Sequence, residues 1–139
     1  LEAGKYRLAL KTPKDQIINV EYIRDKSKKK AAYKKSKAIN LKSDIDSIYT
    51  STEKAARWYK ASVSSTKKRK AVTLSKDSVG GGFKFCVYQK GKRLKTVKVT
   101  KNDKVKTVKL PKKKGTYYVK VTKLTSKTTG AYYLGTYTY

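Results

Sequence analysis

Lysine is the side chain whose number and spacing point to chemistry in this sequence. Lys and Arg together number 37 against nine Asp and Glu, which gives the 139 residues a formal net charge of +28. Only five of these cations are Arg. Lys is a hydrated point charge, whereas Arg presents a planar fork that reads a base or a phosphate bidentately. The composition therefore favours binding of anionic polymers without sequence-specific readout.

Three short runs concentrate the positive charge, and each falls in a segment predicted to be a loop or turn. If the runs converge in space, they would attract teichoic acid, sulfated glycan, nucleic acid or anionic lipid headgroups. One alternative is that each run is solvated separately. Another is that a Lys-biased composition placed Lys wherever the surface needed a polar residue. The runs are Lys28, Lys29 and Lys30; Lys67, Lys68, Arg69 and Lys70; and Lys112, Lys113 and Lys114.

Residues that commonly carry catalysis or bind metals are scarce. The chain has no His and one Cys, so the usual zinc, copper and iron ligand sets and His-based catalysis are missing, and we expect no enzyme. Asp44 and Asp46 could contribute to a calcium site, but a full shell needs six to eight oxygens. We therefore expect no metal and no cofactor. Specific recognition of DNA or RNA is not expected either, because no known nucleic-acid motif is present.

The start of the chain and its lone thiol bear on location. No run approaches the roughly 18 consecutive apolar residues of a transmembrane helix. The sequence begins at Leu1 without a signal peptide, which we interpret as a mature product or an excised fragment. A secreted, extracellular or cell-wall-associated location is expected, because a domain of this charge would otherwise meet the nucleic acids of its own cytoplasm. Cys86 is predicted to be a small buried residue.

Short β-strands are predicted along most of the chain. Residues 4–10 and, weakly, 17–23 resemble strands, and from residue 38 onward runs rich in Val, Tyr, Phe and Thr recur between turn residues. Short strands at a spacing of roughly ten residues are typical of an antiparallel sandwich or barrel. The later runs are 38–41, 43–49, 58–63, 71–74, 83–88, 94–99, 105–110, 117–121 and 131–137.

Strand alternation assigns side chains to the two faces of the sheets. Tyr117, Val119 and Val121 share one face and are predicted to lie in the core. Phe83, Phe85 and Val87, and likewise Val97 and Val99, are also assigned inward. The opposite face is predicted to carry three of the twelve tyrosines as aromatic contacts for a ligand, namely Tyr88, Tyr118 and Tyr132.

Two segments do not follow the strand pattern. Residues 25–37 contain nine Lys and Ser residues and are predicted to be an exposed loop or linker, with a short helix compatible with 29–35. Residues 53–57 are compatible with one helical turn before Trp58. The predicted organisation is therefore an N-terminal part, 1–37, of strands and basic linker, followed by a β-sandwich over 38–139.

Four segments carry a resemblance to a known family: residues 58–63, 82–88, 115–121 and 129–134. In order and spacing they resemble the bacterial pre-peptidase C-terminal (PPC) domain, a secreted jelly-roll β-sandwich appended to extracellular proteases. The resemblance implies an all-β, antiparallel sandwich of jelly-roll type. Relatives include collagen-binding domains of bacterial collagenases, which grip a triple helix with exposed tyrosines. Ala56 and Arg57 stand where the family usually has acidic residues, so the calcium site of some relatives is not expected.

These observations lead to one functional hypothesis and two alternatives. The hypothesis is a secreted non-catalytic module that adheres to anionic polysaccharide, wall polymer or matrix through its lysine-rich loops, with an anionic membrane surface as a second class of partner. The first alternative is a cationic antimicrobial or toxin-like protein. The second is an accessory or inhibitor domain that binds a protein, its charge serving solubility alone. The oligomeric state is not predicted.

Overall fold

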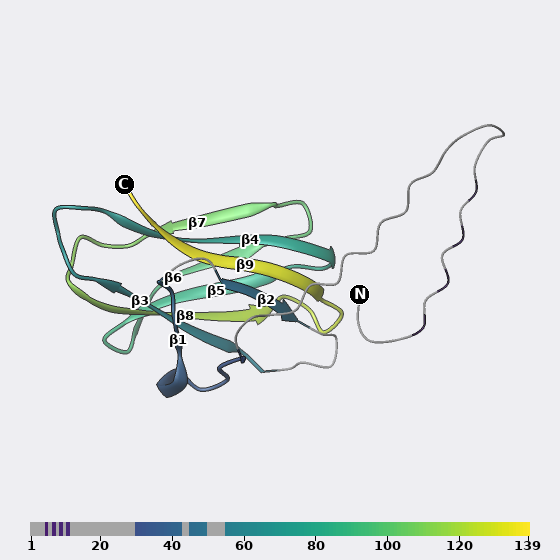
Figure 1. The fold of residues 1–139 in the computed structure, drawn as a ribbon, viewed down its shortest axis with the longest axis horizontal. Coiled ribbons are helices and arrows are strands. Elements are labelled where there is room, and N and C mark those ends of the chain that lie inside the picture. Colours follow the sequence, from purple (N-terminus) through teal and green to yellow (C-terminus); the bar gives the residue numbers. More distant parts are fainter. Residues whose placement is uncertain are drawn as a thin grey trace.

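The computed structural model describes residues 30–42, 45–49 and 55–139, together with positions 5, 7, 9 and 11, and gives the backbone alone for 45–49 and 77–80. The described residues form two β-sheets packed face to face (Figure 1). The strand predicted over 17–23, and the strand over 4–10 apart from isolated positions, lie outside the described residues.

The described chain consists of strands and one 3₁₀ turn. One sheet has five strands in the order β1-β3-β8-β5-β6, and the other has four in the order β2-β9-β4-β7. In chain order the elements are η1 (Lys35–Lys37), β1 (Ile39–Asn40), β2 (Ile45–Tyr49), β3 (Arg57–Val63), β4 (Lys70–Gly80), β5 (Phe83–Gln89), β6 (Lys92–Val99), β7 (Val105–Lys109), β8 (Gly115–Lys123) and β9 (Thr129–Thr138).

Strands β2 to β9 have the connectivity of a jelly roll. Their pairs are nested, with β2 against β9, β3 against β8, β4 against β7 and β5 against β6, as in one long hairpin. The hairpin is rolled so that β4 also pairs with β9, and β5 with β8. All these pairs are antiparallel, whereas β1 adds a short parallel strand beside β3. The prediction of an antiparallel jelly-roll sandwich is confirmed.

The core lies between the two sheets and follows the predicted alternation. In β8, Tyr117, Val119 and Val121 are fully buried, and the intervening residues are half-buried on the outer face. The inward residues of β5 and Val99 of β6 are likewise buried. Apolar burial of this kind is the main favourable term in folding. Strand periodicity therefore identified most of the core of the five-stranded sheet.

A tyrosine pair joins the two sheets through the middle of the core. Tyr59 of β3 and Tyr132 of β9 are both fully buried, and their hydroxyl oxygens are 2.6 Å apart. The two rings meet edge to face, with centroids 6.4 Å apart, and Phe83 packs on Tyr132 with centroids 5.0 Å apart. Buried hydroxyls need hydrogen-bond partners, and this pair supplies one across the sheets.

The helical expectations fail in the described residues. The turn predicted over 53–57 is wrong for its described part, since residues 55 and 56 are not helical and Arg57 already begins β3. The 3₁₀ turn η1 overlaps the helix predicted at 29–35 only at Lys35. The backbone N–H of Trp58 donates to the carbonyl of Ala32 at 2.8 Å, and Ala32 is buried. Part of the predicted linker therefore packs on the sandwich. The described residues include no helix long and apolar enough to cross a membrane.

The β4–β5 connection is held tightly at Gly82. Its N–H donates to the Thr128 hydroxyl at 3.2 Å, and its carbonyl accepts from the N–H of Leu124 at 2.9 Å. A Cβ added at Gly82 would lie 2.1 Å from the carbonyl oxygen of Val99. The turn through three consecutive glycines is thus held by hydrogen bonds on both sides of its third residue.

We expect Gly82→Ala to lower the free energy of unfolding by about 3 kcal/mol, because a Cβ would collide with backbone that cannot rotate away. The matched control is Gly91→Ala. Gly91 has φ +79° but open space around it, so only the left-handed backbone is strained and the expected loss is about 1 kcal/mol. Urea denaturation of both variants measures the difference, and equal losses would contradict the steric argument.

We expect Tyr59→Phe and Tyr132→Phe each to cost about 1 kcal/mol of stability, because each removes one partner of a buried hydrogen bond. The double variant should cost less than the sum of the two single losses, by roughly 1 kcal/mol. Thermal or urea unfolding of the four proteins in this cycle tests the coupling. Strict additivity would mean that the two hydroxyls do not stabilise one another.

Candidate polyanion-binding surface

Three connections meet at the end of the sandwich that carries the C-terminus, on the left of Figure 1. They are the β3–β4 loop, the β5–β6 turn and the β7–β8 loop. Val63 at the end of β3 lies opposite Gly115 at the start of β8, and the Leu110 N–H donates to the carbonyl of Lys70 at 2.8 Å. Strand register therefore brings together loops that are far apart in the sequence.

These connections display a dense group of exposed cations, which we call the basic end. Two of the three predicted clusters contribute to it, and the β5–β6 turn adds cations that the sequence analysis did not single out. Lys70 is the exception in its cluster, because it is half-buried and its Nζ donates to the Ser62 carbonyl at 2.7 Å. The exposed residues of the basic end are Lys67, Lys68, Arg69, Lys90, Lys92, Lys112, Lys113 and Lys114.

A buried tyrosine holds the lysine turn of the β7–β8 loop. The Tyr117 hydroxyl donates to the carbonyl of Lys113 at 2.9 Å and to that of Pro111 at 3.3 Å. Burial raises the pKa of Tyr117, and a hydrogen bond from Gln89 acts in the opposite direction. The hydroxyl therefore keeps its proton at neutral pH and remains a donor. A residue of the rigid core thus fixes the backbone from which three lysines extend.

The third predicted cluster is not part of this end in the described residues. Lys28 and Lys29 lie outside them. Lys30 is exposed, but it is two residues from Ala32, whose carbonyl is bonded to Trp58 near the start of β3. The basic end lies at the other end of that strand. Two clusters therefore converge, and Lys30 lies apart from them.

Half-buried aromatic side chains lie on the outer face of the five-stranded sheet, and we call Trp58, Tyr88 and Tyr118 the aromatic patch. Tyr88 of β5 lies opposite Tyr118 of β8, and the rings of Trp58 and Tyr88 have centroids 5.6 Å apart. The predicted outward positions of Tyr88 and Tyr118 agree with this face. The sequence analysis did not propose Trp58 for this face. Its position next to the inward-facing Tyr59 would have placed it there, because successive strand residues point to opposite faces.

Cations border the aromatic patch on every strand of the row. Lys60 lies opposite Tyr118, and Arg93 lies opposite Tyr88. The Lys35 Nζ is 4.6 Å from the Tyr118 ring centroid, and the Lys120 Nζ is 5.5 Å from the Trp58 centroid, both within range of cation–π attraction. Sequence reasoning did not propose these lysines, because none belongs to the three runs that it singled out.

Cys86 lies beneath this face and behaves as a packing residue. It is buried, as predicted, and its sulfur is 3.4 Å from the Thr96 hydroxyl. Burial raises the pKa of Tyr88, the neighbouring Cys86 raises it further, and Arg93 opposes both. Tyr88 therefore remains a neutral phenol at physiological pH. The patch offers apolar rings and hydroxyls, with the positive charge supplied by its border.

The prediction that Tyr132 is an exposed contact residue is wrong. Tyr132 is fully buried and belongs to the pair with Tyr59. Leu74 of β4 lies opposite Leu134 of β9, so the even-numbered positions 132 and 134 face the core. Tyr133, the neighbouring tyrosine, is the half-buried residue of the two. Tyr132 is therefore removed from the candidate site.

Carboxylates are almost missing from the side chains that the structure describes. Asp103 is the one described, and its Oδ1 is 2.7 Å from the Lys106 Nζ in the β6–β7 turn, at the end opposite the basic end. No group of three His, Cys, Asp or Glu gathers among the described residues, and the side chains of Asp44 and Asp46 lie outside them. No described carboxylate side chain therefore offsets the cations of the basic end.

The fold and this surface define a jelly-roll β-sandwich with one strongly basic end. The chain is similar to the solved structure of the pre-peptidase C-terminal domain of collagenase from Bacillus anthracis, with a TM-score of 0.54 and 17% sequence identity. The match covers 72% of this chain and 92% of that domain. No family model matches the sequence, and no curated protein matches it. The predicted resemblance to the PPC domain is confirmed as a likeness of fold.

We expect Asp103→Asn to lower the melting temperature at pH 6. The hydrogen bond from Lys106, and then those from Thr100, hold the pKa of the carboxyl well below its ordinary value of 3.8. A depressed pKa in the folded state gives stability that is complete above the ordinary value and is lost as the pH falls below it. The difference between wild type and variant should therefore shrink between pH 4 and pH 2. Calorimetry at several pH values measures it, and a constant difference would contradict the linkage.

Proposed function

We propose that this chain is a secreted, non-catalytic module that holds an anionic polymer, such as a wall polymer, a sulfated glycan or a matrix component, at its basic end. The observation that carries the proposal is the convergence of eight exposed cations from three connections, with no described carboxylate side chain among them. Cations gathered on one surface produce a positive potential that attracts polyanions and raises their rate of association.

The composition of the basic end matches a polymer better than a defined small ligand. Seven of its eight cations are Lys, and Arg69 is the one Arg. Ammonium groups on flexible stems adapt to charges spaced along a chain and do not demand a fixed bidentate geometry. Binding should therefore depend on the density of anionic groups more than on their arrangement.

The aromatic patch lies beside the basic end and supports the same proposal. Tyr88 is two residues before Lys90 of the β5–β6 turn, and Tyr118 is opposite it on β8. A polymer that leaves the basic end along this face would meet rings bordered by Lys60 and Arg93. Tyrosine provides apolar area with a polar tip, which suits contact with a hydrated polymer.

The fold supports an accessory role outside the cell. The similar domain is named as the C-terminal domain of a collagenase, and PPC domains are attached to secreted bacterial proteases. A module of this kind would keep an attached catalytic domain close to a surface, and it needs no nucleophile or metal of its own. The extracellular location and the absence of activity are parts of this proposal.

We expect the triple variant Lys112→Gln, Lys113→Gln and Lys114→Gln to bind heparin at least about tenfold more weakly than wild type at 150 mM NaCl, since each lysine near a polyanion contributes up to about 1 kcal/mol. The slope of log affinity against log salt concentration should fall in magnitude by about 2. Titration calorimetry across a salt series measures both quantities.

The matched control removes three exposed lysines from the opposite end, through Lys101→Gln, Lys104→Gln and Lys127→Gln. It has the same net charge as the test variant, so an equal loss of affinity in both would refute a localised site. Leakage of dye from anionic vesicles would favour the antimicrobial alternative, and recovery of one stoichiometric secreted protein would favour the protein-binding alternative.

A further inference from the structure

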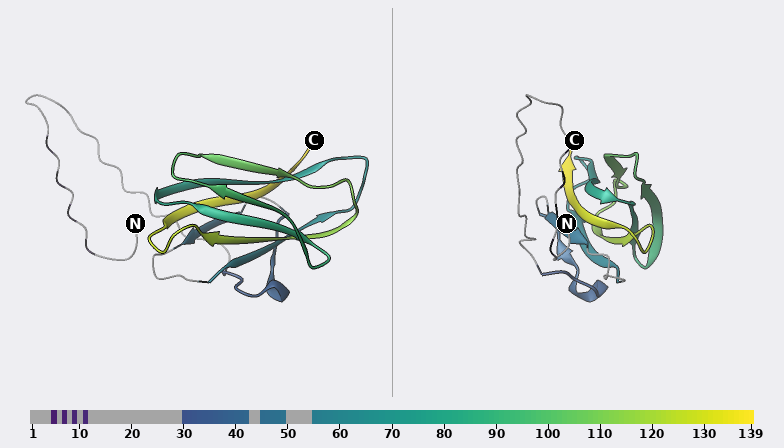
Figure 2. Two further views of the ribbon diagram at one scale, coloured as in Figure 1. Left: turned by 180° about the vertical axis from the view of Figure 1, so that it is seen from behind. Right: turned by 90° about the vertical axis from the view of Figure 1, so that its right-hand side faces the viewer.

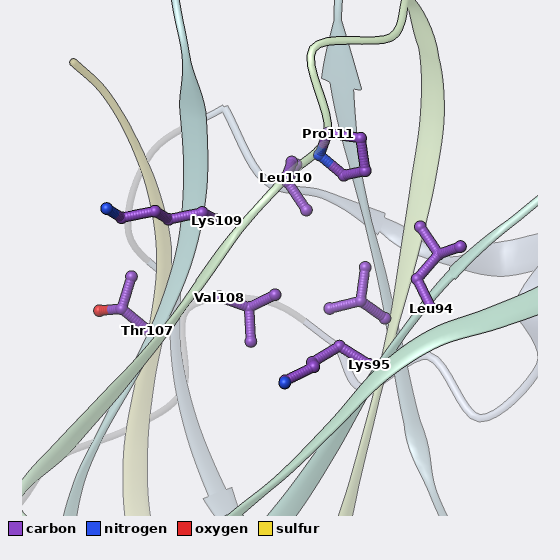
Figure 3. Close-up of a pocket in the computed structure, with 8 residues that line it drawn as sticks. Leu94, Lys95, Thr107, Val108, Lys109, Leu110 and Pro111 are labelled. Carbon is purple, nitrogen blue, oxygen red and sulfur yellow. The ribbon is translucent and has the colours of Figure 1, made fainter.

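A second candidate site is an apolar cavity between the edges of the two sheets, next to the β7–β8 loop. The cavity has a volume of about 350 Å³ and opens between β6 of the five-stranded sheet and β7 of the four-stranded sheet (Figure 3). We call it the edge slot. The residues that matter here are Val87, Leu94, Lys95, Val108, Leu110 and Pro111.

The slot exists because the two edge strands do not pair with one another. β6 and β7 are each the last strand of their sheet, so no backbone pairing closes the sandwich between them (Figure 2 shows the sandwich from behind and along its side). Val87, Val108 and Leu110 are buried core residues that also line the slot. The cavity therefore reaches apolar side chains of the interior and is more than a groove on the surface.

A β-bulge places two different side chains at the mouth of the slot. Val87 lies opposite Lys95, but Tyr88 lies opposite Arg93, so Leu94 is the extra residue of β6. Leu94 is 43% exposed, a large exposure for an apolar side chain beside the core. Since Lys95 is opposite an inward residue, it occupies a core-facing position of its strand. The bulge thus places an exposed leucine next to Lys95, which is also exposed but stands on the core-facing side of the strand.

Lys95 gives the slot its charge. Figure 3 shows its side chain extending from β6 toward Val108, whereas the Nζ of Lys109 points away from the slot and lies 5.5 Å from the Tyr139 ring centroid. Asp103, the one carboxylate among the described side chains, is bonded in the β6–β7 turn and does not line the slot. Of the two lysines that line the slot, only Lys95 therefore extends toward its apolar floor.

We infer that the edge slot binds the hydrocarbon chain of a single-chain anionic amphiphile, with its carboxylate or other anionic head on Lys95. The apolar floor favours methylene groups, and the ammonium favours one negative charge at the entrance. A volume near the lower limit of ligand pockets suits one acyl chain and not a two-chain lipid. The inference concerns residues outside the basic end and does not depend on the polymer proposal.

We expect dodecanoate, kept below its micellar concentration, to bind at one saturable site. In methyl-resolved NMR spectra the signals of Val87, Leu94, Val108 and Leu110 should shift with a common affinity. From octanoate to dodecanoate the affinity should rise about fourfold for each added methylene, the increment expected for burying a CH₂ group. An affinity that does not change with chain length would overturn the proposal, since it would indicate attraction to surface lysines alone.

The charge at the mouth is tested by Lys95→Met, which keeps the apolar stem and removes the ammonium. We expect dodecanoate to bind about tenfold more weakly to this variant. The matched control is Lys98→Met on the same strand. Lys98 faces outward opposite Lys84, so its loss should change the affinity less than twofold. Equal effects of the two variants, or equally tight binding of dodecyltrimethylammonium, would overturn the assignment.

The apolar floor is tested by Val108→Phe, which fills the slot and should abolish the saturable binding. If that variant does not fold, Leu94→Gln is the second test. Leu94 is exposed, so its replacement should leave the core intact and weaken the binding of dodecanoate about tenfold. Unchanged binding in either folded variant would exclude the slot. The triple variant of the basic end should retain full dodecanoate affinity, so failure here and failure of the polymer proposal are separate outcomes.

Discussion

The register of β8 between β3 and β5 is the constraint on which the rest of the molecule depends. In this register Tyr117, Val119 and Val121 enter the core, while Tyr118 and Lys120 face solvent. A shift by one residue would exchange the two sets and bury lysine, because successive strand residues point to opposite faces. Because the chain has a net charge of +28, few acidic side chains exist to pair with the buried lysines, and the shifted register would be unstable. The same lysines that crowd the surface therefore help to specify the fold.

Strand alternation alone predicted much of the five-stranded sheet, because Lys84 in β5 and Lys120 in β8 mark the outer face of each strand. Tyr132 was assigned wrongly, since residues 131–134 are Ala, Tyr, Tyr and Leu and no charged residue marks the outer face. The pairing of β9 with β4 determines which face Tyr132 occupies, because Leu134 lies opposite the buried Leu74. Strand β4 also runs on to Gly80 through polar residues that carry no strand signal, because its neighbour β9 is long enough to pair with it.

The candidate site could be predicted only in part. Runs of lysine are visible in the sequence, but their convergence depends on which loops share an end of the sandwich, and that follows from the nested pairing of β3 with β8 and β4 with β7. Lys60 and Lys120 are single lysines on separate strands and Lys35 belongs to η1, so only the fold brings them together around the aromatic patch. The side chains at the mouth of the edge slot are set by a bulge at Leu94, a departure from regular pairing that alternation cannot foresee.

The nested pairing also governs when this chain can fold during its synthesis. Strand β9, the last of the described strands in chain order, lies between β2 and β4, so the four-stranded sheet lacks its link until β9 has been synthesised. Contacts between residues so distant in sequence make folding slow. Until β9 is available, β2 has no neighbour in the described sheet, and the pair of β4 and β7 cannot be joined to it.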